Sequence, residues 1–522
     1  MSQIQRPAPG RLLPLWAAIL VAAAAGVILD TASPSVGWWP LAFVGVGLAL
    51  ITLIGRSGWG ALTVGLVFGS SFYLVHIIWI TRYLGVVPWF ALSGLQALIM
   101  GLGSILITLA YRWFPRVFPS RSPRLIGLPL LVAGVWTMRE LVMGSWPYTG
   151  FPWGRIGMTQ SESPLASVVS WTGTTGLTFL MVALCAAVIE WVRVARWREW
   201  RTAVPAAACV AILLLTPTFP TTASGTMAIG SVQGNGPTGY FDDRAANEIL
   251  NSQLAATTPL LGQDLDLLVW PEGGIDSDPL RNTRTASALD LLAKRIGAPL
   301  LVNAVTERDG LTYNTSMVWE AGRGAVALHD KTVPVPMGEY VPNREFFALL
   351  APDLINLIQR EYSPGTRSPL VVAAGVPIGL AICFDVLYDD VIWTGAREGA
   401  EVFVFQTNNA DFRDTDENVQ QLAFARMRAI ETGRAVVNIS TVGTSQVIDA
   451  DGTTLDELRA DTVGTMLNEV PLYTGLTPAS VIGPAVAGII GWGTLLTLIG
   501  LGVLQRVRRH RAPTERAAAL KR

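Results

Sequence analysis

Three short segments of the chain each place an ionisable or reactive side chain at the end of an apolar, strand-like run. The candidate groups are the carboxyls of Glu272 and Glu339, the amine of Lys331 and the thiol of Cys383. A thiol nucleophile, a carboxylate that carries protons and a cation that compensates charge on oxygen are the groups that covalent acyl transfer needs. The segments are Trp270–Gly273, Lys331–Pro342 and Ala381–Asp385.

Each segment taken alone has a simpler interpretation. A glutamate after a strand is usually a solvated loop residue, a lone lysine a surface charge and a cysteine an inert core residue. Together the groups are consistent with cysteine-dependent acyl transfer. A thiol is only partly ionised near neutral pH and needs a base or a nearby cation to become a nucleophile. Glu272 can take that proton and later remove one from an attacking amine, while Lys331 compensates charge on the oxygen.

These segments belong to a stretch, from about Met227 to Leu476, with the composition of one globular α/β domain. Apolar residues that recur at spacings of three and four residues predict helices over Thr285–Ile296 and Asn418–Thr432. Short aliphatic runs predict strands over Met227–Gln233, Leu265–Trp270, Pro299–Val305, Thr315–Trp319, Ile378–Ile382, Val402–Gln406 and Ala435–Ile439.

The sequence has no cluster with metal-ligand spacing, and Gly322–Gly324 lacks the strand-to-helix context of a phosphate-binding loop. We therefore predict no metal and no other cofactor. His329, the only histidine of the α/β stretch, is predicted to be a surface residue. Cys383 is its only cysteine and has no local disulfide partner, since Cys185 and Cys209 lie in apolar runs.

The composition of the whole chain indicates a membrane protein. Of its 522 residues, 51% are hydrophobic and 15% charged, and the mean hydropathy is +0.42. Crossing about 30 Å of hydrocarbon takes roughly 20 apolar helical residues. Eight segments qualify, of which the fifth carries Arg139 and Glu140 and the seventh is short: Leu12–Leu29, Trp38–Ile54, Ala61–Ile80, Trp89–Tyr111, Leu125–Met143, Trp171–Val192, Thr202–Phe219 and Val481–Leu504.

Basic residues in short loops report orientation, because Lys and Arg are retained on the cytoplasmic side. One set of loops and ends is basic, and the intervening loops hold only Arg82 and Arg155. This alternation places both chain ends in the cytoplasm and the α/β stretch outside; a cleaved signal peptide in place of the first span would leave that sidedness unchanged. The basic set comprises Arg6 and Arg11, Arg56, Arg112 to Arg124, Arg193 to Arg201, and Arg506 to Arg522.

The carboxylate, lysine and cysteine segments occur in the order found in the nitrilase superfamily. Together with Val232–Asn235 and the flanking arrangement of seven spans before the domain and one after it, they resemble bacterial apolipoprotein N-acyltransferases, actinobacterial ones included. The resemblance covers nearly the whole chain. It implies a polytopic α-helical membrane protein with an inserted αββα sandwich, divided into a seven-helix region at 1–220, an extracytoplasmic catalytic domain at 221–476 and a last helix with a basic tail at 477–522.

The resemblance implies roles for the site residues. Cys383 is the expected nucleophile, Glu272 the general base and Lys331 the stabiliser of the oxyanion, with Glu339 as a supporting second glutamate. The implied reaction moves an acyl chain from a phospholipid to the cysteine, and then to the α-amine of the N-terminal S-diacylglyceryl-cysteine of an apolipoprotein. The expected partners are therefore a phospholipid donor, a diacylated apolipoprotein acceptor and the plasma membrane.

Two features depart from the family pattern. Phe384 and Asp385 follow the cysteine where many members have tyrosine and glutamate, so a role for a phenol hydroxyl is in doubt and the acid reaches less far. The loop after Asn235, which carries a functional tryptophan in the family, offers only Tyr240 and Phe241. We expect Phe384 and Asp385 to support the site.

The aromatic, proline-broken segment Trp146–Arg155 lies on the predicted outer side of the membrane. One interpretation is an interfacial aromatic belt. The other is the floor of a lipid entry route beneath the catalytic domain, with Arg139 and Glu140 as a paired intramembrane couple.

Two other functions fit parts of the pattern. A membrane-tethered amidase would use the same three residues with water as acceptor, but a soluble substrate gives no reason for eight spans. A transporter or lipid-binding scaffold with an inactive domain would be free to lose one of the three residues. Nucleic acid is a poor partner for a chain of net charge -1; a polyprenol-phosphate mannose synthase, with which some actinobacterial relatives occur, is a weaker expectation.

Overall fold

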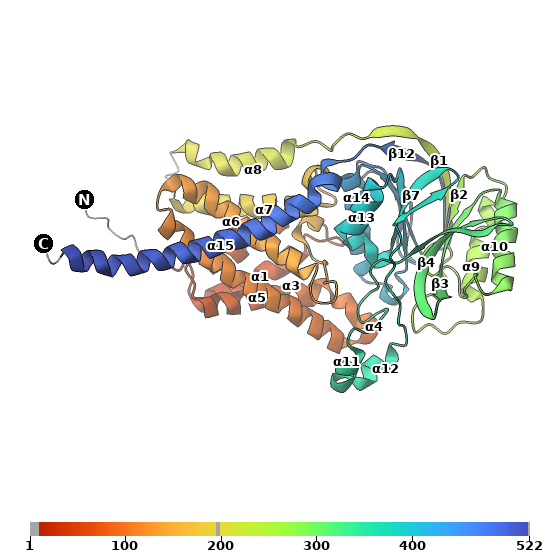
Figure 1. Ribbon diagram of the computed structural model, residues 1–522, viewed down its shortest axis with the longest axis horizontal. Helices are drawn as coiled ribbons and strands as arrows, with labels where there is room; N and C mark the ends of the chain where they lie inside the picture. Colours follow the sequence, from red (N-terminus) through yellow and green to blue (C-terminus); the bar gives the residue numbers. More distant parts are fainter. Residues whose placement is uncertain (1–9, 195–198, 520–522) are drawn as a thin grey trace.

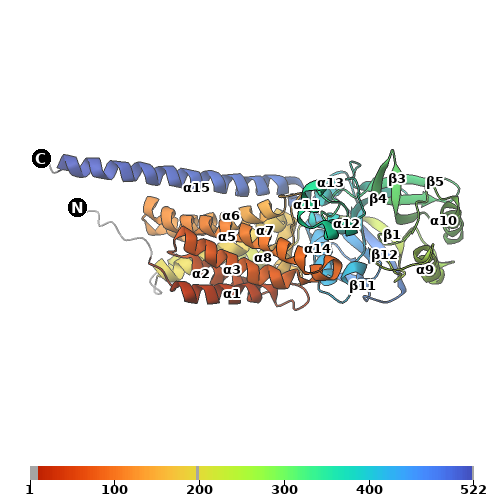
Figure 2. The ribbon, with the colours of Figure 1, turned by 90° about the horizontal axis from the view of Figure 1, so that it is seen from below.

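A computed structural model describes residues 10–194 and 199–519. A helical region and an α/β region lie end to end, and the long last helix runs back beside the helical region (Figures 1 and 2). The predicted fold class is therefore observed in its main features: apolar helices and an inserted α/β domain. Four arginines of the predicted basic clusters lie outside the described residues, namely Arg6, Arg196, Arg198 and Arg522.

The helices of the first region overlap the predicted apolar segments, except for the short α4, which lies between the third and the fourth. Arg139 and Glu140 lie within one of them, α6. The helices are α1 (Leu15–Asp30), α2 (Leu41–Leu53), α3 (Gly58–His76), α4 (Thr81–Leu84), α5 (Val86–Val117), α6 (Arg121–Met143), α7 (Val169–Val194), α8 (Val204–Leu215) and, after the α/β region, α15 (Pro478–Ala519).

The prediction of eight spans is not confirmed. Within the described residues, five helical segments are long and apolar enough to cross a membrane: Gly58–His76, Val86–Val117, Arg121–Met143, Ala166–Val194 and Pro478–Arg508. The apolar helices α1, α2 and α8 are shorter; at a rise of about 1.5 Å per residue, the 13 residues of α2 extend only about 20 Å. Pro40 and Gly55 bound α2, which is why the helix is shorter than its apolar run.

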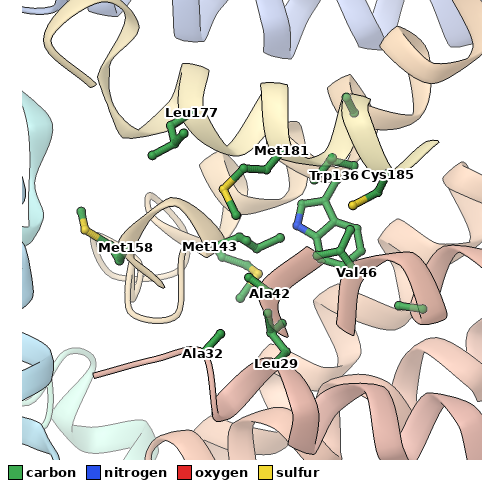
Figure 3. Close-up of a cluster of buried hydrophobic side chains, with 14 of the residues drawn as sticks. Leu29, Ala32, Ala42, Val46, Trp136, Met143, Met158, Leu177, Met181 and Cys185 are labelled. Atoms are coloured by element: carbon green, nitrogen blue, oxygen red, sulfur yellow. The ribbon is translucent and has the colours of Figure 1, made fainter. Parts of the chain in front are cut away.

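The helical region packs around large side chains that face small ones. Figure 3 shows Trp136 of α6 and Met181 of α7 beside Leu29 of α1 and Val46 of α2. Small residues let helices approach closely, as where a Cβ added to Gly69 would lie 2.8 Å from the Cα of Ala97.

The ion pair predicted within the fifth span is present. Arg139 donates to Glu140 over 3.4 Å, and the indole of Trp136 donates to the same carboxylate over 3.0 Å. Both charged side chains are buried. Pairing and hydrogen bonding offset the cost of removing two charges from water, so α6 can carry them inside the helical region.

The strands of the α/β region form two six-stranded sheets in the described part of the chain. The first has the order β12-β1-β2-β3-β4-β5 and the second β11-β10-β9-β8-β7-β6. The strands are β1 (Thr222–Gln233), β2 (Leu267–Val269), β3 (Leu300–Arg308), β4 (Leu311–Glu320), β5 (Gly324–Asp330), β6 (Leu370–Ala373), β7 (Val376–Ile382), β8 (Val402–Thr407), β9 (Ala435–Ser440), β10 (Ser445–Ile448), β11 (Thr454–Leu458) and β12 (Gly464–Thr474).

The two sheets lie between layers of helix, which gives the predicted αββα sandwich. Aliphatic side chains from both sheets, including Ile229 and Val404, form the core between them. On the outer face of the first sheet lie α9 (Glu248–Ala256) and α10 (Thr283–Ile296), whereas α13 (Asp389–Arg397) and α14 (Glu417–Thr432) lie between the second sheet and the helical region (Figure 1). Two short helices, α11 (Arg344–Leu350) and α12 (Pro352–Leu357), project beside α4.

Every strand predicted from an aliphatic run overlaps an observed one, and both predicted helices are present as α10 and α14. The sequence prediction missed β5, β6 and β10 to β12, as well as α9 and α11 to α13. Several of these carry alternating or mixed exposure, as in β11, whose residues are all at least partly exposed. Such segments lack the continuous apolar run on which the strand predictions depended.

The packing of α15 on α6 generates a prediction about stability. A Cβ at Gly134 would overlap the Thr494 side chain, whose own Cβ is 3.2 Å away, whereas nothing lies within 4 Å of a Cβ at Gly493. We expect Gly134→Val to cost about 1–3 kcal/mol more than Gly493→Val, because overpacking displaces the helices. Thermal unfolding in detergent measures the difference, and equal melting temperatures for the two variants would contradict this packing.

Candidate active site

Sheet topology brings the glutamate and the lysine to one edge. β2 is parallel to β3, and β3, β4 and β5 are successively antiparallel, so β2 and β5 run in the same direction. Their carboxyl ends therefore meet at the same edge of the first sheet. Glu272 lies just after β2 and Lys331 just after β5. Cys383 follows β7 of the second sheet.

Lys331 is the centre of a buried ionic cluster. Its Nζ lies 2.9 Å from Oε1 of Glu339 and 3.2 Å from Oε1 of Glu272. The side-chain amide of Asn314, on β4, donates to Glu272 over 2.7 Å. Lys331 is 1% exposed and both carboxylates 7%. An ammonium has three N–H donors, so one remains after these two contacts.

Two carboxylates facing one ammonium leave an excess of negative charge. Burial alone would lower the pKa of Lys331, but Glu272 and Glu339 more than offset it and hold that pKa well above its usual value. Burial raises the pKa of Glu272; Lys331 opposes this and Glu339 adds to it. The lysine therefore stays charged, while Glu272 is readied to accept a proton.

Cys383 lies on a strained turn between β7 and a 3-10 helix, η6 (Cys383–Leu387). Its φ is +50°, a conformation that a residue with a Cβ adopts at an energetic cost. The side-chain amide of Gln421 donates to Sγ over 3.4 Å. Burial, with a contribution from Glu272, raises the pKa of the thiol. The cysteine therefore rests as a neutral thiol, and attack requires a base to remove its proton.

Asp385 ties the cysteine turn to the lysine segment. Its carboxylate accepts the backbone N–H groups of Val333 over 2.8 Å, Thr332 over 3.2 Å and Ile382 over 3.3 Å. Burial raises its pKa to about 6, and Lys331 and the three N–H donors oppose that rise. One carboxylate thus fixes the distance between two segments on different sheets.

Phe384 faces the aromatic segment Trp146–Arg155. Its ring centroid lies 6.3 Å from that of Phe151, in a stacked orientation, and 5.5 Å from that of Tyr388. Phe384 therefore forms part of an apolar wall. The predicted aromatic segment also contributes Pro147, Tyr148 and Trp153 to the lining of the cavity that contains Cys383.

That cavity has a volume of about 740 Å³ and joins the two regions of the molecule. Glu272, Lys331 and Cys383 line its α/β end. The helical region supplies a predominantly apolar end, which comprises Trp79, Ile80, Leu84, Val87, Pro88, Ala91, Leu92 and Leu95. The cavity is large enough, and apolar enough at one end, for a long acyl chain.

Comparison with known proteins agrees with this two-part architecture. Residues 25–187 match the family described as apolipoprotein N-acyltransferase N-terminal domain, and residues 228–475 match the carbon-nitrogen hydrolase family. An apolipoprotein N-acyltransferase from Mycolicibacterium smegmatis is 31% identical over 95% of this chain and 85% of the relative. The chain belongs to the apolipoprotein N-acyltransferase family.

A second sequence relative agrees with this assignment. An apolipoprotein N-acyltransferase from Azotobacter vinelandii is 27% identical over 96% of this chain and 97% of the relative. Among solved structures, an amidase from Nesterenkonia sp. is 18% identical, with a TM-score of 0.36 over 49% of this chain and 94% of the amidase. The family assignment depends on the sequence relatives.

In this N-acyltransferase the structure brings together the residues that the sequence singled out. Glu272, Lys331 and Glu339 are in direct contact, and Cys383 lines the same cavity. Of the two aromatic residues after Asn235, Tyr240 lines the cavity as well. The catalytic roles of these residues remain predictions.

Sequence reasoning missed three polar residues around the cluster. Asn314 lies mid-strand on β4, and Gln421 lies on the first turns of α14. Glu417, 3% exposed, lines the cavity and accepts the Asn409 amide over 2.7 Å; burial raises its pKa to about 8. Each of these residues is a polar side chain at a position that faces the core. A single sequence does not distinguish such a side chain from a polar side chain exposed to solvent.

The prediction for His329 was wrong. Its side chain is fully buried, with Nδ1 3.0 Å from the carbonyl oxygen of Ser368. Burial lowers its pKa to about 4, so the ring is neutral near neutral pH. β5 is covered on this side by the chain before β6, and this pairing of distant segments is not visible in the local sequence. Among residues 10–194 and 199–519 no group of three or more His, Cys, Asp or Glu side chains is arranged to hold a metal.

The position of Asp385 generates a prediction about turnover. In Asp385→Asn an amide N–H₂ replaces one of the oxygens that accept backbone N–H groups, so Lys331 and Cys383 move apart. Charged hydrogen bonds contribute about 1.5–3 kcal/mol, and we therefore expect kcat/KM to fall about 10- to 100-fold. The exposed Asp390 provides the matched control, Asp390→Asn. If the two variants turn over N-acyltransferase substrate equally fast, Asp385 does not position the site.

Proposed function

We propose that this N-acyltransferase transfers an acyl chain from a phospholipid to Cys383 and then to the α-amine of a diacylated apolipoprotein. The observation that carries the proposal is the continuity of one cavity from the buried Glu272, Lys331 and Cys383 to the apolar helices. An amidase for soluble substrates has no need of that apolar end. Membership of the N-acyltransferase family supports amine rather than water as the acceptor.

The first half-reaction begins with the neutral thiol. Glu272 takes the thiol proton while sulfur attacks the ester carbonyl carbon of the phospholipid. The remaining N–H of Lys331 stabilises the oxyanion. The carbon–oxygen bond of the ester then breaks, and the lysophospholipid alkoxide takes the proton back from Glu272. The thioester on Cys383 is the product.

The second half-reaction reverses these roles. The α-amine of the lipidated cysteine attacks the thioester, Glu272 removes a proton from the nitrogen, and the carbon–sulfur bond breaks. The departing thiolate recovers the proton, and the amide is released. Because the acceptor carries its own acyl chains, it can use the apolar part of the cavity that the lysophospholipid vacates. A two-step exchange of this type gives ping-pong kinetics.

The membrane arrangement is part of the proposal. We place 1–220 and 477–522 in the membrane with both chain ends cytoplasmic, and 221–476 on the outer face. The aromatic segment Trp146–Arg155 would then form the floor of the lipid entry route, which its place in the cavity wall supports. An interaction with a polyprenol-phosphate mannose synthase stays a prediction from the family resemblance.

Cys383 should carry a covalent acyl group after exposure to phospholipid alone. The first half-reaction needs only the donor, so the thioester accumulates without an amine acceptor. Intact-mass analysis should show one fatty acyl adduct that neutral hydroxylamine removes. Cys383→Ala, which retains Cys185 and Cys209, is the control and should show none. An unmodified wild-type enzyme that nevertheless transfers acyl groups would disprove the covalent mechanism.

Glu272→Gln and Lys331→Ala should each lower thioester formation by at least about 100-fold while the protein stays folded. The first removes proton transfer and the second removes oxyanion compensation, a loss that typically costs on the order of 100-fold. Lys294→Ala, at an exposed position on α10, is the control. Near-normal rates in either purified variant would exclude that residue from the mechanism.

The orientation predicts the outcome of reporter fusions. A fusion after Phe219 should be active with a reporter that works only outside the cytoplasm. A fusion after Arg511 should be active with a reporter that works only inside it, since basic loops remain cytoplasmic. Enzymatic reporters that work on one side of the membrane measure this in intact cells. The same location for both fusions would refute the arrangement.

A further inference from the structure

Arg360 presents an unpaired cation to the cavity. It follows α12 and lines the same cavity as Cys383 and Glu272. In the part of the chain that the structure describes, its guanidinium has no carboxylate within 4.0 Å and no hydrogen-bond acceptor. Arg344, on the neighbouring α11, is instead paired with Glu361 and bound to two backbone carbonyls. The unsatisfied group is thus the one that faces the cavity.

Aromatic rings hold this guanidinium in place. Its central carbon lies 4.1 Å from the ring centroid of Tyr240 and 5.8 Å from that of Tyr362. The Tyr240 hydroxyl donates to the carbonyl of Leu357, which fixes that ring. Stacking on aromatic faces leaves the N–H edge of a guanidinium free, and that edge matches the oxygens of a phosphate. The arrangement is therefore organised for an oxyanion before any ligand binds.

The segment that carries Arg360 is bonded to the segment that carries Glu339, and both line the same cavity. The backbone N–H of Tyr362, two residues after Arg360, donates to the carbonyl oxygen of Glu339 over 2.9 Å. The side chain of Glu339 in turn contacts Lys331. Glu361 alone stands between Arg360 and Tyr362, the residue that is bonded to the backbone of Glu339. In a glycerophospholipid only the glycerol separates the phosphate from the reacting ester.

The other charged groups near Arg360 do not occupy this role. Arg244 also lines the cavity, but its guanidinium donates to the carbonyls of Pro237 and Gly239. Asp411 accepts the backbone N–H of Tyr240 over 2.7 Å. Arg360 is half-buried and opposes the rise in the pKa of Asp411 without forming a salt bridge to it. A ligand that brings an anion into direct contact with the guanidinium therefore gains a charged hydrogen bond there.

We propose that Arg360 binds the phosphodiester of the phospholipid donor and so selects glycerophospholipids over neutral esters. The inference depends on the proposed function, because it assumes that the donor reacts at Cys383. The diacylglyceryl group of the acceptor carries no phosphate. Arg360 therefore acts in the first half-reaction and not in the second.

The test compares two acyl donors in the full-length enzyme. Thioester formation is measured by intact mass with phosphatidylglycerol and with p-nitrophenyl palmitate, which has no phosphate. For Arg360→Gln the ratio of kcat/KM for the phospholipid to that for the neutral ester should fall about 10- to 100-fold, the loss expected for a charged hydrogen bond. Arg360→Lys, which keeps the charge but loses the planar fork, should lie between that variant and wild type.

Arg367→Gln is the matched control, because Arg367 belongs to the same connecting chain but pairs with Asp330 away from the cavity. Its ratio of kcat/KM for the phospholipid to that for the neutral ester should equal the wild-type ratio. An unchanged ratio in Arg360→Gln, or an equal loss with both donors, would overturn the phosphate assignment. If Arg360→Gln does not fold, the ratio for Arg360→Lys decides by the same criterion. Wild-type enzyme that forms no thioester with either donor would refute the proposed function itself.

The two half-reactions give a second readout. Acyl-enzyme preformed from the neutral ester is mixed with a diacylated cysteinyl peptide. Arg360→Gln should then transfer the acyl group at the wild-type rate within about twofold, because no phosphate takes part in this step. A loss as large as that seen with phosphatidylglycerol would show that Arg360 shapes the cavity as a whole and would contradict the assignment.

Discussion

The buried ammonium of Lys331 is the constraint on which the rest of the site depends. A charge that is 1% exposed is tolerated only if it is fully paired, and Glu272 and Glu339 provide the pairing. Glu272 follows β2, whereas Lys331 and Glu339 lie in the segment after β5, so the cluster exists only when that edge of the first sheet is formed. The single ammonium holds two buried carboxylates at one point, so Lys331 organises the site.

The second sheet is joined to this cluster through Asp385, and the helical region is joined to the second sheet through α13 and α14. Gln420 of α14 accepts the indole N–H groups of Trp79 over 3.1 Å and Trp153 over 2.6 Å. Arg155, from the aromatic segment, pairs with Asp389 at the start of α13 over 2.9 Å. Because one helical layer serves both as the outer face of the sandwich and as the docking surface, Cys383 lines a cavity whose other end consists of apolar helices.

The sequence was sufficient to predict two of the three strands that carry the candidate groups. Glu272 and Cys383 follow β2 and β7, which overlap predicted strands, whereas β5, which precedes Lys331, was missed. The helical period of α10 and α14 was visible. The number of spans was not predictable in the same way. Hydropathy does not show where proline and glycine end a helix, and α1, α2 and α8 are consequently shorter than their apolar segments.

What the sequence could not predict are contacts between segments that are distant along the chain. Asn314 belongs to the cluster because β4 lies beside β5, and His329 is buried because a later segment covers it. Arg360 lines the cavity in a segment that is held by the hydrogen bond from Tyr362 to Glu339. Each depends on tertiary pairing that leaves no periodic pattern, whereas strand ends and amphipathic faces are local properties.

The most direct test of the account is the fate of an isolated acyl-enzyme. Enzyme acylated with a labelled phospholipid, then freed of all lipid, is mixed in a single turnover with a peptide that bears an N-terminal S-diacylglyceryl-cysteine. The account predicts that the label moves stoichiometrically to the α-amine of the peptide while Cys383 returns to its unmodified mass. Release of the label as free fatty acid, with the peptide unchanged, would instead show that water is the acceptor and would contradict the account.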